Sequence, residues 1–245
     1  MDYPNTDGAV RRGIGLARNL GLVLRRTGFV GFAALVADRA TPNVLAFRRT
    51  FVQRADCGGE PHPELAPRRL RSFEPELPPL FAEVARTREP DIQPLGESDL
   101  RERFARGEEL WLFHTGGHVG HLRWIGRGPL MLTGFTLPLR GDERVGEDVV
   151  TLPLARRRGL ARMAALHVRH VLGREGVLSL YGCARASNPR WHAGMQRMGY
   201  VPVASVDLVT FAGRRFLRIV PASSVEAALL EERGIHCGRW MRACE

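Results

Sequence analysis

Residues 149–161 read VVTLPLARRRGLA, and this stretch decides the fold class. Its first four residues are β-branched or apolar, which is typical of a buried strand. A turn with three arginines and Gly159 follows, and an apolar pattern of helical period begins at Leu160. The stretch therefore predicts a strand that turns directly into a helix, which ends before Gly173.

The turn in this stretch has the chemistry of an anion site. The N-terminus of a helix leaves backbone N–H groups unpaired and carries partial positive charge, so it can receive a phosphate. Gly159 has no side chain to obstruct that approach, and Arg156, Arg157 and Arg158 add positive charge. A diphosphate site is one reading of the turn, and a plain turn with solvated arginines is the other.

The order of residues in the turn resembles the acyl-CoA signature R/Q-x-x-G-x-G/A of the GNAT acyltransferase superfamily. The match lies on Arg156, Gly159 and Ala161, preceded by a strand and a proline as in that family. A single short motif of this kind is modest evidence, so its order relative to other motifs matters.

Two further segments follow the same family pattern. Residues 187–189 (SNP) and then 198–200 (MGY) resemble the N-x-x-A and G-F elements after the family's fifth strand. Residues 110–124, which contain three glycines, are similar to its second and third strands. The resemblance covers about residues 90–220, and it implies the GNAT fold.

The resemblance implies that the chain binds acetyl-CoA or another acyl-CoA as acyl donor. Backbone amides of residues 157–161 would hold the pyrophosphate, the strand at Thr151 and Leu152 would pair with the pantetheine arm, and Asn188 would contact the arm from the other side. The residues that the resemblance assigns to donor binding are Thr151, Leu152, Leu154, Arg156, Arg157, Arg158, Gly159, Leu160, Ala161 and Asn188.

The implied reaction moves an acyl group, expected to be acetyl, to a primary amine of an unidentified small-molecule acceptor. It needs a base for the amine and a donor for the thioester carbonyl. By family position, Glu147 and Asp148 are candidate bases, with solvated turn charges as the alternative. Many members have a tyrosine general acid where this chain has Met195, and a thioether cannot donate a proton. Tyr181 and His192 are substitutes by proximity in sequence alone.

Patterning predicts a mixed α/β fold in the order β-α-β-β-β-α-β-α-β-β from residue 91 onward. The family implies a mostly antiparallel sheet, splayed at its fourth and fifth strands and flanked by helices. We expect a basic helical N-terminal extension with a strand (1–56), a Pro-rich connection with little regular structure (57–89), the GNAT domain (90–222), and a C-terminal helix and tail (223–245).

Composition limits which macromolecular partners and metal ligands can be expected. The chain is 44% hydrophobic, which excludes disorder throughout, and its formal net charge is +10. All 36 basic residues are arginine, which indicates a compositional habit, and we expect no nucleic-acid partner. No C-x-x-C pair occurs, and His114, His118 and His121 lack a completing carboxylate, so we expect no metal.

The first ninety residues leave other functions open. The longest uncharged apolar stretch near the start, residues 27–37, is far shorter than the about 20 residues of a membrane span. We expect a cytoplasmic protein, peripheral association with the inner face of the membrane being an alternative. The basic helix of the extension would suit an acyl carrier protein delivering a long acyl chain. A non-catalytic protein that binds a membrane surface or a partner is the third reading, and a homodimer is open.

Overall fold

The computed structural model describes residues 45–60, 65–87, 95–211 and 214–243. The strands of the main sheet are β1 (Leu45–Asp56), β2 (Arg68–Leu70), β3 (Glu109–Thr115), β4 (His118–Gly126), β7 (Glu143–Thr151), β8 (Ser179–Arg185), β9 (Val201–Phe211), β10 (Arg214–Pro221) and β11 (Trp240–Arg242). They lie in the order β11-β10-β9-β1-β8-β7-β4-β3-β2. Neighbours run antiparallel except β7 and β8, which are parallel, so the predicted mixed and mostly antiparallel sheet is confirmed.

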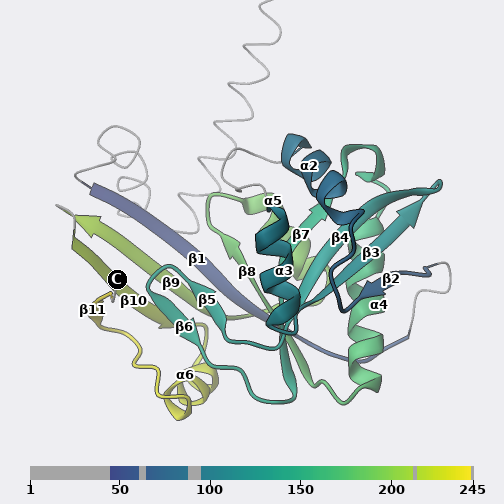
Figure 1. Ribbon diagram of the computed structural model, residues 1–245. Helices are drawn as coiled ribbons and strands as arrows, with labels where there is room; N and C mark the ends of the chain where they lie inside the picture. The colour runs from purple at the N-terminus through teal and green to yellow at the C-terminus, as the bar shows by residue number, and fades with distance from the viewer. Residues whose placement is uncertain (1–44, 61–64, 88–94, 212–213, 244–245) are drawn as a thin grey trace, which may run out of the picture.

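Helices cover both faces of this sheet (Figure 1). The helices and the small separate hairpin are α2 (Leu77–Thr87), α3 (Glu97–Ala105), the 3-10 turn η1 (Pro153–Ala155), α4 (Leu160–Arg174), α5 (Pro189–Arg197), α6 (Ser224–Glu232), β5 (Leu130–Leu132) and β6 (Phe135–Leu137). Within the described residues, no helix has both the length and the apolar character needed to cross a bilayer.

Three apolar cores hold these layers together. Helices α2 and α3 pack on one face of β2, β3 and β4, where Phe81 and Phe104 contact Trp124. On the opposite face, α4 and α5 pack through residues such as Val168 and Met195. The third core joins α6 and the β5–β6 hairpin to β9 and β10. Each helix thus buries one apolar stripe against a sheet face, which is the main stabilising contribution of such layers.

Strand β1 lies in the middle of the sheet, although the sequence assigns it to the N-terminal extension. Val52 pairs with Cys183 of β8 on one side and with Ala204 of β9 on the other. The sheet therefore includes residues from before the Pro-rich connection. The basic helix expected earlier in the extension lies outside the described residues, and so do residues 91–94 of an expected short strand.

The Pro-rich connection also contains regular structure that the sequence did not predict. Residues 68–70 form β2, which pairs with β3, and α2 begins at Leu77. Pro78 and Pro79 fall in the first turn of α2, where the backbone N–H has no intrahelical acceptor in any case. The prolines therefore start this helix without costing it a hydrogen bond.

The pairing between β7 and β8 is short, and this positions the site. Only Glu143 to Val145 pair with Ser179 to Tyr181. Beyond Val145 the two strands separate, which confirms the predicted splay. Strand β7 also carries a bulge, because Glu147 pairs with Trp124 and Val150 with Leu122 while only Arg123 lies between those partners.

Candidate active site

A cavity of about 820 Å³ lies where β7 and β8 separate. Residues 146–149 of β7 and 182–185 of β8 line it, together with Ala161 in the first turn of α4. The structure thus brings four sequence-predicted residues to one cavity: Glu147, Asp148, Ala161 and Asn188.

The two carboxylates of the cavity differ in how they are held. Asp148 Oδ2 accepts a hydrogen bond from Arg103 Nη2 at 2.6 Å, whereas Glu147 Oε2 lies 3.7 Å from the same nitrogen. Asp148 has φ of 43°, in the left-handed region, and it lies in the bulge. Burial raises the pKa of Glu147 and Arg103 partly opposes the rise. Glu147 combines a raised pKa with the longer distance to Arg103, which suits it to accept a proton.

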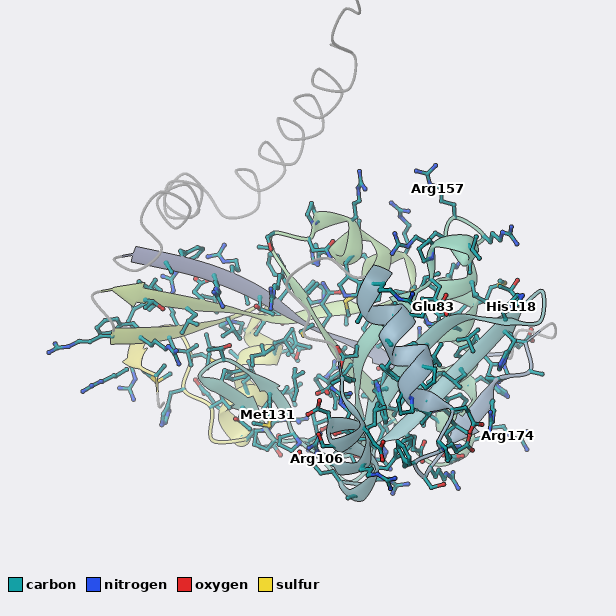
Figure 2. All side chains as sticks on the ribbon, turned by 45° about the horizontal axis from the view of Figure 1, so that its top comes forward. Glu83, Arg106, His118, Met131, Arg157 and Arg174 are labelled. Carbon is teal, nitrogen blue, oxygen red and sulfur yellow. The ribbon has the colours of Figure 1, made fainter. Side chains whose placement is uncertain are left out.

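The first turn of α4 has the geometry expected of an anion site. Gly159 is the N-cap residue, with φ of 75°, and no side chain caps the helix. Within the described residues, no carbonyl accepts a hydrogen bond from the backbone N–H groups of residues 157–161. Arg157 points away from the body of the protein (Figure 2), and Arg156 Nε donates to the Thr151 carbonyl at 3.0 Å. The turn thus combines backbone N–H groups that have no carbonyl acceptor in the described part of the chain with three exposed guanidinium groups.

The residues that lead into this turn serve mostly structural contacts. The Leu152 N–H donates to the Gly120 carbonyl at 2.9 Å, and Thr151 Oγ1 bonds His121 Nδ1 at 2.8 Å. Leu152 is buried and Leu154 is 83% exposed. The Leu152 N–H bond is made on the β4 side of β7, and the Thr151 carbonyl accepts from Arg156. On the side facing β8, the pairing of β7 ends at Val145, and residues 146–149 beyond it line the cavity. Leu160 is buried in the core under α4.

The Asn188 side chain can accept a hydrogen bond through its oxygen and donate one through its nitrogen. Its Oδ1 accepts a hydrogen bond from the Trp191 N–H at 3.1 Å, so it caps α5. Its side-chain NH₂ has no acceptor among the described residues and lies on the cavity lining. The amide can therefore cap the helix and donate to a ligand at once.

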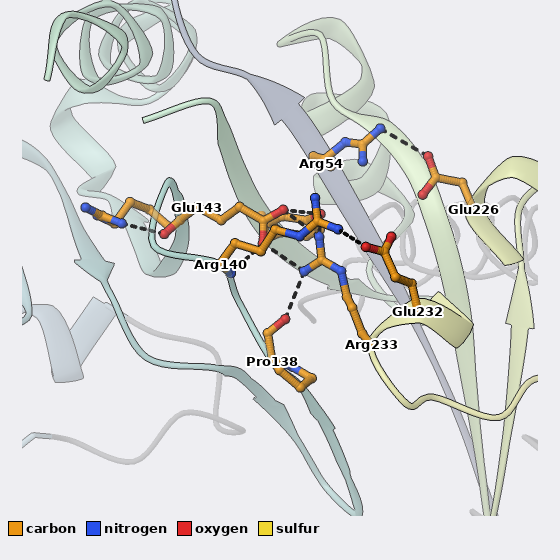
Figure 3. Close-up of polar contacts among 9 residues, drawn as sticks. Arg54, Pro138, Arg140, Glu143, Glu226, Glu232 and Arg233 are labelled. Carbon is orange, nitrogen blue, oxygen red and sulfur yellow. Dashed lines mark hydrogen bonds and ion pairs between the residues drawn. The ribbon is translucent and has the colours of Figure 1, made fainter. Parts of the chain in front are cut away.

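The structure does not bring Tyr181 to this cavity. Its ring lies in the core beneath α6, and its hydroxyl donates to Glu143 Oε1 at 3.2 Å. Glu143 in turn pairs with Arg233 at 2.6 Å (Figure 3). Burial raises the pKa of Tyr181. His192 is likewise buried, hydrogen-bonded to Gln53 and stacked on Phe51.

Sequence reasoning missed two cavity residues, Arg123 and Tyr200. Arg123 is 4% exposed, and its Nη2 lies 3.4 Å from the Tyr200 hydroxyl oxygen. Strand alternation could have indicated that Arg123 is buried, because it places Arg123 on the same face of β4 as His121 and Ile125. Both of those neighbours are buried in the structure. Met195, at the position where the resemblance implies a tyrosine, also lines the cavity.

Other chemistry of the cavity is limited. Burial raises the pKa of Cys183 to about 11, so its thiol stays protonated at neutral pH. No group of three His, Cys, Asp or Glu side chains suited to a metal ion occurs in the part of the chain that the structure describes.

No protein-family profile and no curated protein sequence matches the chain. Among solved structures, it is similar to a protein described as an acetyltransferase from the GNAT family of Novosphingobium aromaticivorans, at 16% identity and a TM-score of 0.48 over 72% of this chain. It is also similar to GCN5-related N-acetyltransferases from Kribbella flavida and Sphaerobacter thermophilus, both at 13% identity, with TM-scores of 0.42 and 0.43 over 79% and 78% of this chain. Each match covers 66% of the solved chain, so this chain spans slightly under two thirds of their length.

Proposed function

We propose that this protein is an acyltransferase that moves an acyl group, expected to be acetyl, from acyl-CoA to a primary amine. One observation carries the proposal: a single cavity extends from Ala161, in the first turn of the uncapped helix α4, to two carboxylates inside a split in the sheet. A helix N-terminus suits a pyrophosphate, and an open strand edge suits the amides of a pantetheine arm. The carboxylates then stand where the arm would end.

The residues present fit an acyl-CoA substrate. Backbone N–H groups of residues 157–161 would bind the pyrophosphate, because they lack carbonyl acceptors and Gly159 leaves the approach open. The edge of β7 beyond Val145, where its pairing with β8 ends, would pair with the arm, and the Asn188 NH₂ group at the start of α5 would donate to it from the other side. Pairing at the Thr151 carbonyl would require Arg156 to release it.

The proposed chemistry is direct transfer. The amine nitrogen attacks the thioester carbonyl carbon, a C–N bond forms, the C–S bond breaks, and the sulfur leaves as thiolate. Glu147 takes the proton that the amine gives up, directly or through a water. Tyr200, whose hydroxyl lines the cavity in place of the usual tyrosine, is the proposed proton donor to the thiolate. The net result is an amide and the free thiol.

The alternative functions have no specific support here. Delivery by an acyl carrier protein and attachment to a membrane both depend on the basic extension, and residues 1–44 lie outside the described part of the chain.

The direct test is calorimetric titration of acetyl-CoA into the wild type, Gly159→Glu and Gly176→Glu. Both glycines have positive φ, 75° and 82°, and open space where a Cβ would stand, but Gly176 lies beyond the other end of α4. Backbone strain and added charge are thus matched, and only Gly159→Glu would repel the pyrophosphate. We expect binding by the wild type and Gly176→Glu and none by Gly159→Glu. A folded wild type that binds no acyl-CoA would overturn the proposal.

A further inference from the structure

Arg123 is an arginine buried without a carboxylate partner. It is 4% exposed, and within the described residues its hydrogen bonding consists of the 3.4 Å contact to the Tyr200 hydroxyl. Its Nε is buried and has no acceptor. No carboxylate of the described chain lies within ion-pair distance of it. An uncompensated buried cation is unfavourable, because burial removes its hydration and nothing replaces it.

The rest of the interior follows the opposite pattern. Every buried carboxylate of the described residues has an arginine within ion-pair distance; these carboxylates belong to Glu108, Glu109, Glu143, Asp207 and Glu226. Arg103, on the same cavity as Arg123, pairs with Asp148. The isolation of Arg123 is therefore specific to its position.

That position is the closed end of the split between β7 and β8. Gly146 follows Val145, the last residue of β7 that pairs with β8, and a Cβ at position 146 would lie 3.0 Å from Arg123 Nη2. Gly182 faces it on β8, and a Cβ there would meet Met195 and Tyr200. The two glycines leave the room that the guanidinium and the phenol occupy. Nearby His121 cannot supply a negative charge, and it adds no second positive one at neutral pH, because burial and then the Arg123 cation lower its pKa to about 3.

We infer that Arg123 binds a carboxylate group of one of the two substrates, at the closed end of the cavity. The inference rests on the proposed function only for the identity of those substrates. A planar carboxylate suits a guanidinium, which can bind it through two parallel hydrogen bonds. The carboxylate comes either from the acyl group, as in a dicarboxylic monothioester, or from the amine, as in an amino acid.

The experiment compares matched ligands that differ in one carboxylate, on the full chain. In the donor arm, calorimetry measures succinyl-CoA against butyryl-CoA, which have acyl chains of equal carbon number. In the acceptor arm, thermal shift of the acetyl-CoA complex measures β-alanine against propylamine. We expect a preference of about tenfold or more for the carboxylate in one arm, and that arm identifies the source. Arg123→Met should abolish the preference and retain acetyl-CoA binding.

Arg185→Gln is the matched control. Arg185 lines the same cavity but is exposed, so its loss should leave the preference unchanged. Without ligand, Arg123→Met should keep or raise the wild-type Tm, because it removes an uncompensated buried charge, whereas a purely structural role predicts a lower Tm. If Arg123→Met does not fold, Arg123→Gln, which can still donate to Tyr200, takes its place in the same comparison.

The outcomes separate this inference from the proposed function. Acetyl-CoA binding without a carboxylate preference in either arm overturns the inference and leaves the acyltransferase proposal standing. Absence of any acyl-CoA binding overturns that proposal, and sodium succinate against sodium chloride at equal ionic strength then decides the inference. A Tm rise with succinate in wild type and Arg185→Gln but not in Arg123→Met supports the anion site, and no rise overturns it.

Discussion

Glu147 and Asp148 are adjacent in sequence, yet their surroundings assign them different tasks. Asp148 is held by a charge-assisted hydrogen bond to Arg103 at 2.6 Å, which fixes a residue in left-handed backbone geometry. Glu147 lies farther from the same arginine, and burial raises its pKa. Two neighbouring carboxylates whose environments differ in this way commonly divide into a positioning group and a proton acceptor.

We predict that Glu147→Gln lowers kcat/KM by about a hundredfold or more, since it removes the base. Acyl-CoA affinity should stay near the wild-type value. Wild-type kcat/KM should rise with pH through a pKa above the ordinary range of a glutamate, because the base acts deprotonated. The matched variant Asp148→Asn, which tolerates positive φ, should retain that pH profile with a smaller loss of activity. Steady-state kinetics from pH 5 to 9 on the wild type and the two variants measure these profiles. An unchanged pH profile of kcat/KM in Glu147→Gln would contradict the assignment of Glu147 as the base.

The raised pKa of Glu147 also determines how its contribution to folding stability changes with pH. The folded protein holds this proton more tightly than the unfolded chain, so the contribution of Glu147 to stability falls as pH rises from the ordinary glutamate range through the raised value. Glu147→Gln should therefore not lower Tm at neutral pH. A large loss of Tm would mean that the pair with Arg103 outweighs the burial of the charge.

At residue scale, the sequence predicted the carboxylates and the helix turn but not which tyrosine reaches the cavity. Tyr181 immediately precedes Gly182, which lines the cavity, so alternation sends its side chain to the other face. Sequence order alone does not tell which face of β8 the cavity opens on. Tyr200 immediately precedes β9, and its approach to Arg123 depends on packing between distant strands that no local pattern encodes.

At element scale, α4 and α5 were predictable because residues next to each helix in the sequence mark where it begins. Gly159 precedes the first residue of α4, and Asn188 with Pro189 starts α5, as a cap followed by proline at the first helical position. The predicted end of α4 before Gly173 was wrong, because the helix continues through Gly173 to Arg174. The pair β7–β8 was predictable only through the family resemblance. Its parallel register depends on a crossover through α4, which local periodicity does not reveal.

We predict that the two functions of Asn188 can be separated by substitution. Asn188→Asp keeps the Oδ1 cap but loses the NH₂ donor, so Tm should hold while acyl-CoA affinity falls by about tenfold. Asn188→Ala should lose affinity and also about 1 kcal/mol of stability. Ser223→Ala, which removes the cap of α6 away from the cavity, should lose similar stability and no affinity. Calorimetry and thermal melts check this, and full affinity in Asn188→Asp would remove Asn188 from the donor site.

At the scale of the whole molecule, β1 joins two halves of the sheet. On one side lie β8, β7, β4, β3 and β2 with the cavity, and on the other lie β9, β10 and β11. The sequence predicted β1 as a strand from its β-branched and aromatic residues, but assigned it to the extension because a Pro-rich segment follows it. Pairing partners more than a hundred residues away, such as Cys183 for Val52, are not encoded in local composition.

We predict that a fragment of residues 57–245 does not unfold cooperatively, whereas residues 45–245 do. The two differ only by β1, whose removal leaves both β8 and β9 with an unpaired edge and exposes the apolar surface around Val52 and Ala55. Unpaired edges of this kind also favour aggregation, which light scattering would detect alongside thermal melts. A cooperative melt of 57–245 with acyl-CoA binding intact would mean that the domain is complete without β1, as the sequence-based boundaries imply. Loss of both would assign the first strand of the domain to residues 45–56, ahead of the Pro-rich connection.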